Sequence, residues 1–311
     1  MKKDLLNLYD LDNTDFEEIF DRSEKLKKMN KEGISYTPLK ERVLGMIFEK
    51  SSTRTRLSFE VGIYQLGGIA TFLSPRDIQL GRGESIADTA RVMSRYLDGI
   101  MIRTFAQEWV DEFAKWATIP VINGLTDFLH PCQILSDIFT VIEKKGRYEG
   151  LKIAYVGDGN NITNSWINAA AKLPFQLTVA CPAGYDPDEF ILKRGMRESV
   201  CGITVLRSPA EAVADADIIY TDVWASMGQE NEKEKRAVIF KNYQVNSKLI
   251  NYAKDDVIVM HCLPAHRGEE ITDEVVDGPQ SVVLDQAENR LHVQKAIMEI
   301  LMGSKGSNLY S

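Results

Sequence analysis

The stretch 43–66, VLGMIFEKSSTRTRLSFEVGIYQL, decides the fold of this chain. Its first six residues form an apolar run typical of a buried strand, and residues 55–66 carry apolar side chains at helical spacing. Ser51 and Ser52 stand where the helix begins, and hydroxyl groups at that position cap free backbone N–H groups. The stretch therefore predicts a strand, a tight turn and a helix.

The same turn is a candidate anion site. Free N–H groups and the positive end of the helix dipole attract negative charge at a helix N-terminus. Arg54 and Arg56 add planar guanidinium groups, which match the oxygens of a phosphate. The plainer interpretation is a capped helix with two solvated arginines, and a short motif alone does not separate the two. We take a phosphate cradle as the hypothesis to test.

The composition limits the class of protein. The 311 residues are 44% hydrophobic and 26% charged, as in ordinary globular proteins, and the length predicts about two α/β domains. The net charge of −8 argues against a nucleic-acid partner. No apolar run is long enough to span a membrane, and residues 1–10 lack the apolar core of a secretory signal. We therefore expect a cytoplasmic protein with no membrane partner, whose cysteines are free thiols.

Strand-like and helix-like patterns alternate along the chain, which predicts an α/β fold with two doubly wound domains of mostly parallel sheet. A polar break at Lys144–Gly150 divides the series, so we expect domains over residues 1–144 and 145–311. Near the N-terminus, Thr14-Asp15-Phe16-Glu17 predicts a capping box. We interpret the polar segment Ala225–Arg236 as a surface loop or a lid. The expected strands are 43–48, 69–73, 99–102, 121–123, 152–156, 177–181, 203–206, 218–221 and 257–260.

Unusual residues recur at the ends of these strands, where ligands of such folds bind. Arg103 follows the third strand, and His130 begins a helix after the fourth. In the second half of the chain, Asp222 follows one strand, and His261 and Cys262 follow another. A lone histidine is more often structural than functional, but several such residues at the same kind of strand end indicate a site.

Two other interpretations of these motifs are weaker. Gly157-Asp158-Gly159 resembles a dinucleotide-binding turn, but Ile162 stands where the third glycine belongs. His261, Cys262 and His266 could bind zinc, but the chain has no second pair of cysteine ligands nearby. Two interpretations of Cys262 remain open: it is a small buried hydrophobic residue, or it is a residue of the site.

Three motifs taken together resemble the aspartate/ornithine carbamoyltransferase family: Ser52-Thr53-Arg54-Thr55, His130-Pro131-Cys132-Gln133 and His261-Cys262-Leu263-Pro264. Asp222-Val223-Trp224, followed by Ser226-Met227-Gly228, is similar to the ornithine branch of that family. The likeness covers essentially the whole chain. It implies one domain for carbamoyl phosphate, one for the amino acid and an active site in the cleft between them. It also implies that the last helix, residues 286–311, packs back onto the first domain.

The resemblance further implies roles for individual residues. No metal or organic cofactor is implied, and the assembly would be a homotrimer or a multiple of trimers, with Gln79 reaching a neighbouring subunit's site. The implied catalytic residues are Arg103, His130, Cys262 and Arg290. The implied contacts to carbamoyl phosphate are Ser52, Thr53, Arg54, Thr55, Gln79, Arg103, His130, Gln133 and Arg290. Those to ornithine are Asn161, Asp222, Ser226, Met227, Cys262 and Leu263.

The implied reaction moves the carbamoyl group of carbamoyl phosphate to the side-chain amine of L-ornithine, giving citrulline and phosphate. It would serve arginine synthesis or, in reverse, citrulline breakdown. Arg103, His130 and Thr55 suit an oxyanion site, and the leaving phosphate can accept the amine proton. One alternative is a sister transferase acting on putrescine, aspartate or a modified ornithine. The other is a non-catalytic binding protein on the same fold, which would not need these oxyanion-stabilising groups.

Overall fold

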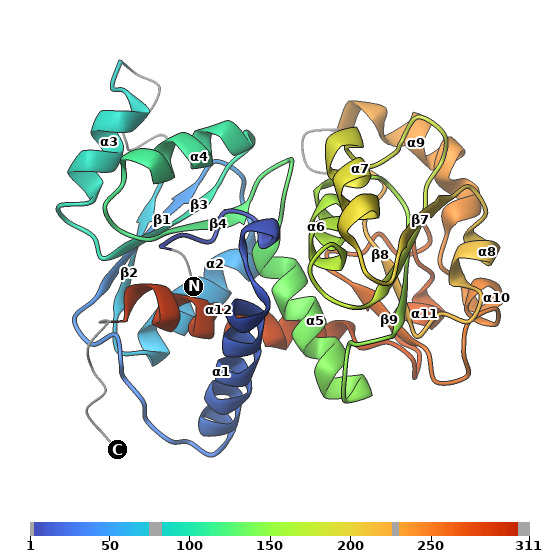
Figure 1. Ribbon diagram of the computed structural model, residues 1–311, viewed down its shortest axis with the longest axis horizontal. Coiled ribbons are helices and arrows are strands. Elements are labelled where there is room, and N and C mark those ends of the chain that lie inside the picture. The colour runs from blue at the N-terminus through green and yellow to red at the C-terminus, as the bar shows by residue number, and fades with distance from the viewer. Residues whose placement is uncertain (1–2, 75–82, 226–229, 304–311) are drawn as a thin grey trace. The chain divides into compact units, whose positions relative to one another are not determined.

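Figure 1 shows the computed structural model of the protein, which describes residues 3–74, 83–225 and 230–303. The chain forms two compact units: residues 1–135 with 290–311, and residues 136–289. The chain passes between the units within helices α5 (Pro131–Lys145) and α12 (Val283–Met302). None of the described helices has both the length and the apolar character needed to cross a bilayer. The domain ranges 1–144 and 145–311 remain predictions.

The first unit contains a sheet of four parallel strands in the order β2-β1-β3-β4. Helices lie on both faces of this sheet, with α3 and α4 on one side and α1 and α2 on the other (Figure 1). The strands are β1 (Val43–Phe48), β2 (Ile69–Leu73), β3 (Gly99–Arg103) and β4 (Val121–Leu125). The helices are α1 (Asn13–Lys31), α2 (Thr53–Gln65), α3 (Ile86–Met93) and α4 (Gln107–Trp116).

Helix α2 and the C-terminal part of α12 pack closely because Gly62 has no side chain. A Cβ atom at Gly62 would lie 2.9 Å from Met298 Cε and 3.3 Å from Lys295 Cγ. Glycine thus permits the close approach that places Arg290, at the start of this part of α12, beside α2.

The second unit contains five parallel strands in the order β7-β6-β5-β8-β9. Helices α6 and α7 pack together, as do α8 and α10. The strands are β5 (Lys152–Val156), β6 (Gln176–Ala180), β7 (Ile203–Leu206), β8 (Ile218–Thr221) and β9 (Ile258–His261). The helices are α6 (Asn161–Ala170), α7 (Glu189–Glu198), α8 (Pro209–Val213), α9 (Lys233–Phe240), α10 (Ser247–Ile250) and α11 (Asp273–Val276).

The strand orders place the predicted motifs at two topological switch points. The order reverses between β1 and β3 in the first unit and between β5 and β8 in the second. Doubly wound sheets bind ligands outside the carboxyl ends of the strands at such points. The Ser51–Thr55 turn follows β1, and Arg103 is the last residue of β3. Asn161 and Asp222 follow β5 and β8.

The α/β class with two parallel sheets flanked by helices is confirmed, but two local predictions were wrong. The capping box uses Asp12 and Asp15, because each side chain accepts from the other residue's backbone N–H, at 3.0 and 3.1 Å. Thr14 instead lies inside α1, where its hydroxyl donates to Asp12. The segment expected to be a loop through Arg236 contains the first turn of α9, which begins at Lys233.

Candidate active site

The turn between β1 and α2 has the cap that the sequence predicts. Ser52 is the N-cap residue of α2, and its Oγ accepts a hydrogen bond from Thr55 N at 3.2 Å. The Ser52 and Thr55 hydroxyl oxygens lie 3.1 Å apart, and Thr55 is buried. Thr53 is the first residue of the helix. This end of α2 therefore combines hydroxyl groups with the positive end of a helix dipole.

Arg290 links this turn to helix α5. Its Nη1 donates to Gln133 Oε1 and its Nη2 donates to Thr55 Oγ1, each at 3.0 Å. Arg290 is buried, and both of these partners are uncharged. A buried guanidinium presents a planar fork of donors that matches the oxygens of a phosphate or carboxylate.

Arg103 ends β3, and its side chain is held by the segment that follows the neighbouring strand β1. Its Nε donates to the Lys50 carbonyl oxygen at 3.2 Å, and the side chain is buried. The register between β3 and β4 shifts between Ile102 and Arg103, and such bulges redirect side chains beside functional sites. Lys50 in turn pairs with Asp127 and lies 4.6 Å from the centre of the Phe105 ring.

His130 lies among the arginines of the first unit. Burial and the positive charges of Arg290, Arg103 and Arg54, in that order, hold the pKa of His130 well below its usual range. The imidazole is therefore neutral at pH 7. A neutral histidine can still donate one hydrogen bond to a carbonyl oxygen, as an oxyanion site requires.

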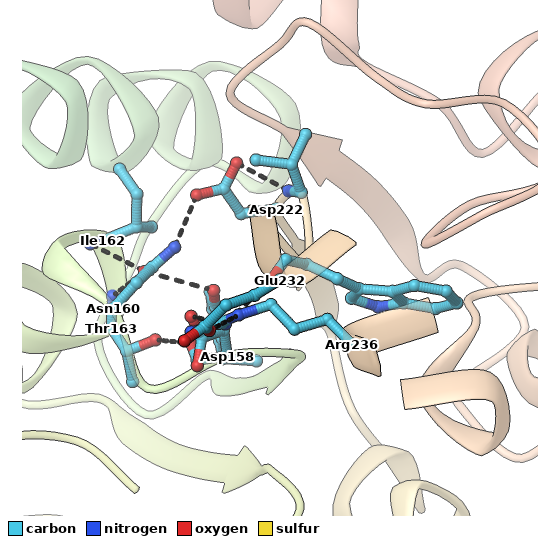
Figure 2. Close-up of polar contacts among 10 residues, drawn as sticks. Asp158, Asn160, Ile162, Thr163, Asp222, Glu232 and Arg236 are labelled. Atoms are coloured by element: carbon cyan, nitrogen blue, oxygen red, sulfur yellow. Dashed lines mark hydrogen bonds and ion pairs between the residues drawn. The ribbon is translucent and has the colours of Figure 1, made fainter. Parts of the chain in front are cut away.

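Asp222 is the polar centre of the second unit. Its Oδ2 accepts from Asn160 Nδ2 at 2.8 Å, a contact that Figure 2 shows. Its Oδ1 accepts from Cys262 Sγ at 2.9 Å and from Val223 N at 2.8 Å. The carboxylate thus joins the ends of β8 and β9 and offers a negative charge to an amino group.

Asn160 holds the start of α6 next to Asp222. Its Oδ1 accepts from Ile162 N at 3.0 Å and from Thr163 N at 3.3 Å, which makes it the N-cap of the helix. Asn161, the predicted ornithine contact, is the first residue of α6 and is half-buried. The cap therefore fixes the backbone from which Asn161 projects.

Arg236 is a site residue that sequence reasoning missed. Its Nη1 donates to Asp158 Oδ2 at 2.7 Å and to the Trp224 carbonyl oxygen at 2.8 Å, while its Nε donates to Glu232 at 2.9 Å (Figure 2). It therefore ties the turn after β5 to the segment after β8. Burial raises the pKa of Asp158 to about 6, although Arg236 opposes this rise. The only sequence signal was a glutamate four positions before the arginine, which is also common on solvated helices.

The turn after β9 is held by a buried histidine. His261 Nδ1 accepts from Leu263 N at 2.8 Å, and His261 Nε2 lies 3.0 Å from Glu270 Oε1. Leu263 has a φ of 56°, in the left-handed region that non-glycine residues seldom adopt. Sequence reasoning named His261 but gave it no contact, and it missed Glu270.

The structure brings the predicted residues together in two groups, one in each unit. Hydrogen bonds join Ser52, Thr55, Gln133 and Arg290 in the first, where Arg54, Arg103 and Arg290 act on His130. In the second, Asn160 and Cys262 both contact Asp222. Asn161 directly follows Asn160 in the sequence, and Leu263 directly follows Cys262. Gln79, Ser226 and Met227 lie outside the described residues.

Comparison with known proteins identifies the family. The sequence model of the aspartate/ornithine carbamoyltransferase carbamoyl-P binding domain matches residues 3–143, and that of the Asp/Orn binding domain matches residues 149–301. An ornithine carbamoyltransferase from Syntrophus aciditrophicus is 68% identical over 302 residues, covering 97% of this chain and 100% of the relative. An anabolic ornithine carbamoyltransferase from Pseudomonas aeruginosa is 59% identical, covering 90% and 91%.

A solved structure agrees with this result. The ornithine carbamoyltransferase from Pyrococcus furiosus superposes with a TM-score of 0.94 at 52% identity, covering 97% of this chain and 98% of that one. Both halves of the chain and both of its sheets are therefore accounted for by the same family. The chain belongs to the aspartate/ornithine carbamoyltransferase family.

Proposed function

We propose that this chain is an enzyme that transfers the carbamoyl group of carbamoyl phosphate to the side-chain amine of L-ornithine. The observation that carries the proposal is the position of His130, a buried neutral imidazole among Arg54, Arg103 and Arg290. Such a group suits a substrate that joins a phosphate to a carbonyl. The relatives that bear the name ornithine carbamoyltransferase support the choice of the second substrate.

The first unit would bind carbamoyl phosphate. The end of α2 and Arg54 would hold the phosphate, since backbone N–H groups and guanidinium groups both bind its oxygens. Arg103 and His130 would donate to the carbonyl oxygen, where negative charge develops. The proposed contacts are Ser52, Thr53, Arg54, Thr55, Gln79, Arg103, His130, Gln133 and Arg290.

The second unit would bind ornithine. Asp222 offers a buried carboxylate to the α-amino group, and its contact with Cys262 places a thiol beside it. Cys262 and the Leu263 backbone would contact the reacting amine and orient it. Because the Cys262 thiol donates to Asp222, we assign it no nucleophilic role. The proposed contacts are Asn161, Asp222, Ser226, Met227, Cys262 and Leu263.

The reaction itself needs no protein nucleophile. The unprotonated amine nitrogen attacks the carbamoyl carbon, and a tetrahedral intermediate forms with negative charge on the former carbonyl oxygen. The bond from that carbon to the phosphate oxygen then breaks, and phosphate leaves with the electron pair. The amine proton can pass to the leaving phosphate. The arginines lower the barrier by stabilising the charge on the oxyanion and on the phosphate.

The proposed assembly is a homotrimer in which Gln79 reaches a neighbouring site. Support comes from exposed apolar side chains in the sequence just before Gln79: Leu57, Val61 and Tyr64 on α2, and Ile69 and Phe72 on β2. Strand β2 is also an edge strand, and exposed apolar edges commonly pair with another chain. The free state of all four cysteines supports a cytoplasmic location.

A panel of amines tests the proposal. We expect citrulline to form from carbamoyl phosphate and L-ornithine, and little product from putrescine or aspartate. Asp222→Asn should raise KM for ornithine by about 10- to 100-fold, because a charged hydrogen bond contributes about 1.5–3 kcal/mol. The substitution Arg197→Ala, at an exposed position, serves as the control, and this variant should behave as the wild type. Turnover of putrescine at the rate of ornithine would overturn the substrate assignment.

A further inference from the structure

The two ring nitrogens of His261 have partners that fix where its proton lies. Leu263 N donates to Nδ1, so Nδ1 must carry a lone pair rather than a hydrogen. Nε2 then carries the proton and donates to the Glu270 carboxylate. The backbone N–H of His261 is also held, by Gln286 Oε1 at 2.9 Å. The contacts therefore select one of the two neutral tautomers.

Burying the Glu270 carboxylate lowers the stability of the fold, which indicates that this residue has a specific role. Its exposed fraction is 0%, and its Oε1 accepts from both His261 Nε2 and His266 N, the latter at 2.6 Å. Its Oε2 has no hydrogen-bond partner among the described residues. A buried carboxylate with a partner on only one of its oxygens lowers stability. The position of Glu270 is explained if its carboxylate orients His261.

Leu263 is the residue that this arrangement holds. Its left-handed backbone is unfavourable for a residue with a Cβ atom and persists where the surroundings determine it. The preceding residue, Cys262, is fastened by its contact with Asp222. Contacts within the protein thus hold Cys262 and Leu263 in place at the carboxyl end of β9. Parallel sheets bind ligands at this end of their strands.

We propose that His261 and Glu270 form a positioning pair for Leu263. Glu270 holds His261 in the tautomer whose Nδ1 captures the Leu263 N–H, and this bond maintains the left-handed turn. The inference rests on the proposed function, which places the Leu263 backbone at the reacting amine. Since both ring nitrogens are used within the protein, His261 is neither a general base nor a metal ligand.

Two substitutions separate the two ring contacts. In His261→Asn the side-chain oxygen occupies the place of Nδ1 and can still accept from Leu263, but nothing reaches Glu270. In His261→Gln the amide nitrogen occupies the place of Nε2 and can donate to Glu270, but no acceptor remains for Leu263. We expect His261→Gln to lose kcat by about 10-fold or more relative to His261→Asn, as for the loss of one hydrogen bond at an active site. KM for carbamoyl phosphate should stay within about two-fold of wild type in both variants.

Thermal unfolding and a neighbouring histidine supply the controls. His266→Asn, on a half-exposed side chain outside the site, should keep wild-type kcat. A purely structural role for His261 would lower the stability of both variants without separating their kcat values. Equal kcat values for His261→Asn and His261→Gln, with both proteins folded, would overturn the proposal.

Nitrogen NMR tests the tautomer without measuring activity. The chain has only four histidines, so ¹⁵N-labelled imidazoles can be assigned by single substitutions. We expect His261 at pH 8 to show a protonated Nε2 and a bare Nδ1. A protonated Nδ1 would overturn the inference even in an active enzyme. A wild-type protein that has the expected tautomer but forms no citrulline would instead refute the proposed function.

Discussion

The Arg290 guanidinium donates to the Thr55 hydroxyl at 3.0 Å, although 235 positions separate the two residues in the sequence. The same guanidinium holds Gln133, so one side chain joins α12, α2 and α5 within the first unit. Thr55 also belongs to the capped turn of α2. Arg290 therefore fixes the proposed phosphate and carbonyl contacts relative to each other.

Replacing Arg290 with lysine should damage carbamoyl phosphate binding even though the charge remains. A lysine ammonium lacks the planar fork that reaches Thr55 and Gln133 together. We expect kcat/KM for carbamoyl phosphate to fall by about 10- to 100-fold in steady-state assays, the loss of one or two good hydrogen bonds. Arg91→Lys, on an exposed helix face, is the matched control. Equal activity of the two variants would show that charge alone is needed.

Arg103→Ala should act mainly on turnover. The Lys50 carbonyl holds this side chain at the end of β3, and its proposed target is the developing oxyanion. Removing one donor from an oxyanion site lowers kcat by about 10²- to 10³-fold. A variant with nearly normal kcat and only a raised KM would place Arg103 in ground-state binding instead.

The activity should rise with pH because of the substrate rather than His130. Only the free amine of ornithine attacks, and the pKa of such an amine is about 10.4. The pKa of His130 is held well below its usual range, so this residue stays neutral as the pH rises from neutral to alkaline values. We expect kcat/KM for ornithine to increase steadily from about pH 6 to pH 9. A fall over this range would mean that another titration controls the rate.

Asp158→Asn should change how stability depends on pH. The pKa of Asp158 is raised from 3.8 to about 6, so between these values the folded state binds more protons than the unfolded state. The wild type therefore loses stability as the pH rises through this window, by about 3 kcal/mol in all. The variant lacks this titration, so its urea-unfolding free energy should fall less between about pH 4 and pH 6. An equally steep or steeper fall in the variant would show that the Arg236 ion pair outweighs burial.

Mixing two inactive variants tests the shared site of the proposed trimer. Gln79→Ala and Arg103→Ala should each be weak alone. After dissociation and random reassembly, about a quarter of the sites would combine an intact Arg103 with an intact Gln79 from the neighbour. Activity should then rise well above that of either parent. If exchange of subunits is confirmed and activity stays at the parental level, Gln79 serves the site of its own chain.

Local sequence signals predicted the strands and helices of the protein and the cap of helix α2 well. The apolar run Val43–Phe48 and the serines after it determine β1 and the cap of α2, because strand burial and helix capping depend on neighbouring residues. Helix α5 likewise begins at Pro131, directly after His130, where the sequence predicts the start of a helix. The motifs at the strand ends followed from the alternation of strands and helices.

Contacts between distant residues could not be predicted in this way. No local pattern pairs Arg290 with Thr55. The lowered pKa of His130 depends on its burial and on three arginines from three separate segments. Glu270 and Arg236 stand in charged stretches of a kind that usually lies on the surface, yet both are buried. Their roles follow from tertiary packing, which a sequence pattern does not contain.

The most direct test of the account is the stoichiometry of the reaction. Purified protein, carbamoyl phosphate and L-ornithine should give citrulline and inorganic phosphate in equal amounts and at equal rates, each dependent on both substrates. Arg103→Ala and Asp222→Asn, one in each unit, should slow both products together. Phosphate release that proceeds without citrulline, or binding of both substrates with neither product, would contradict the proposed carbamoyl transfer.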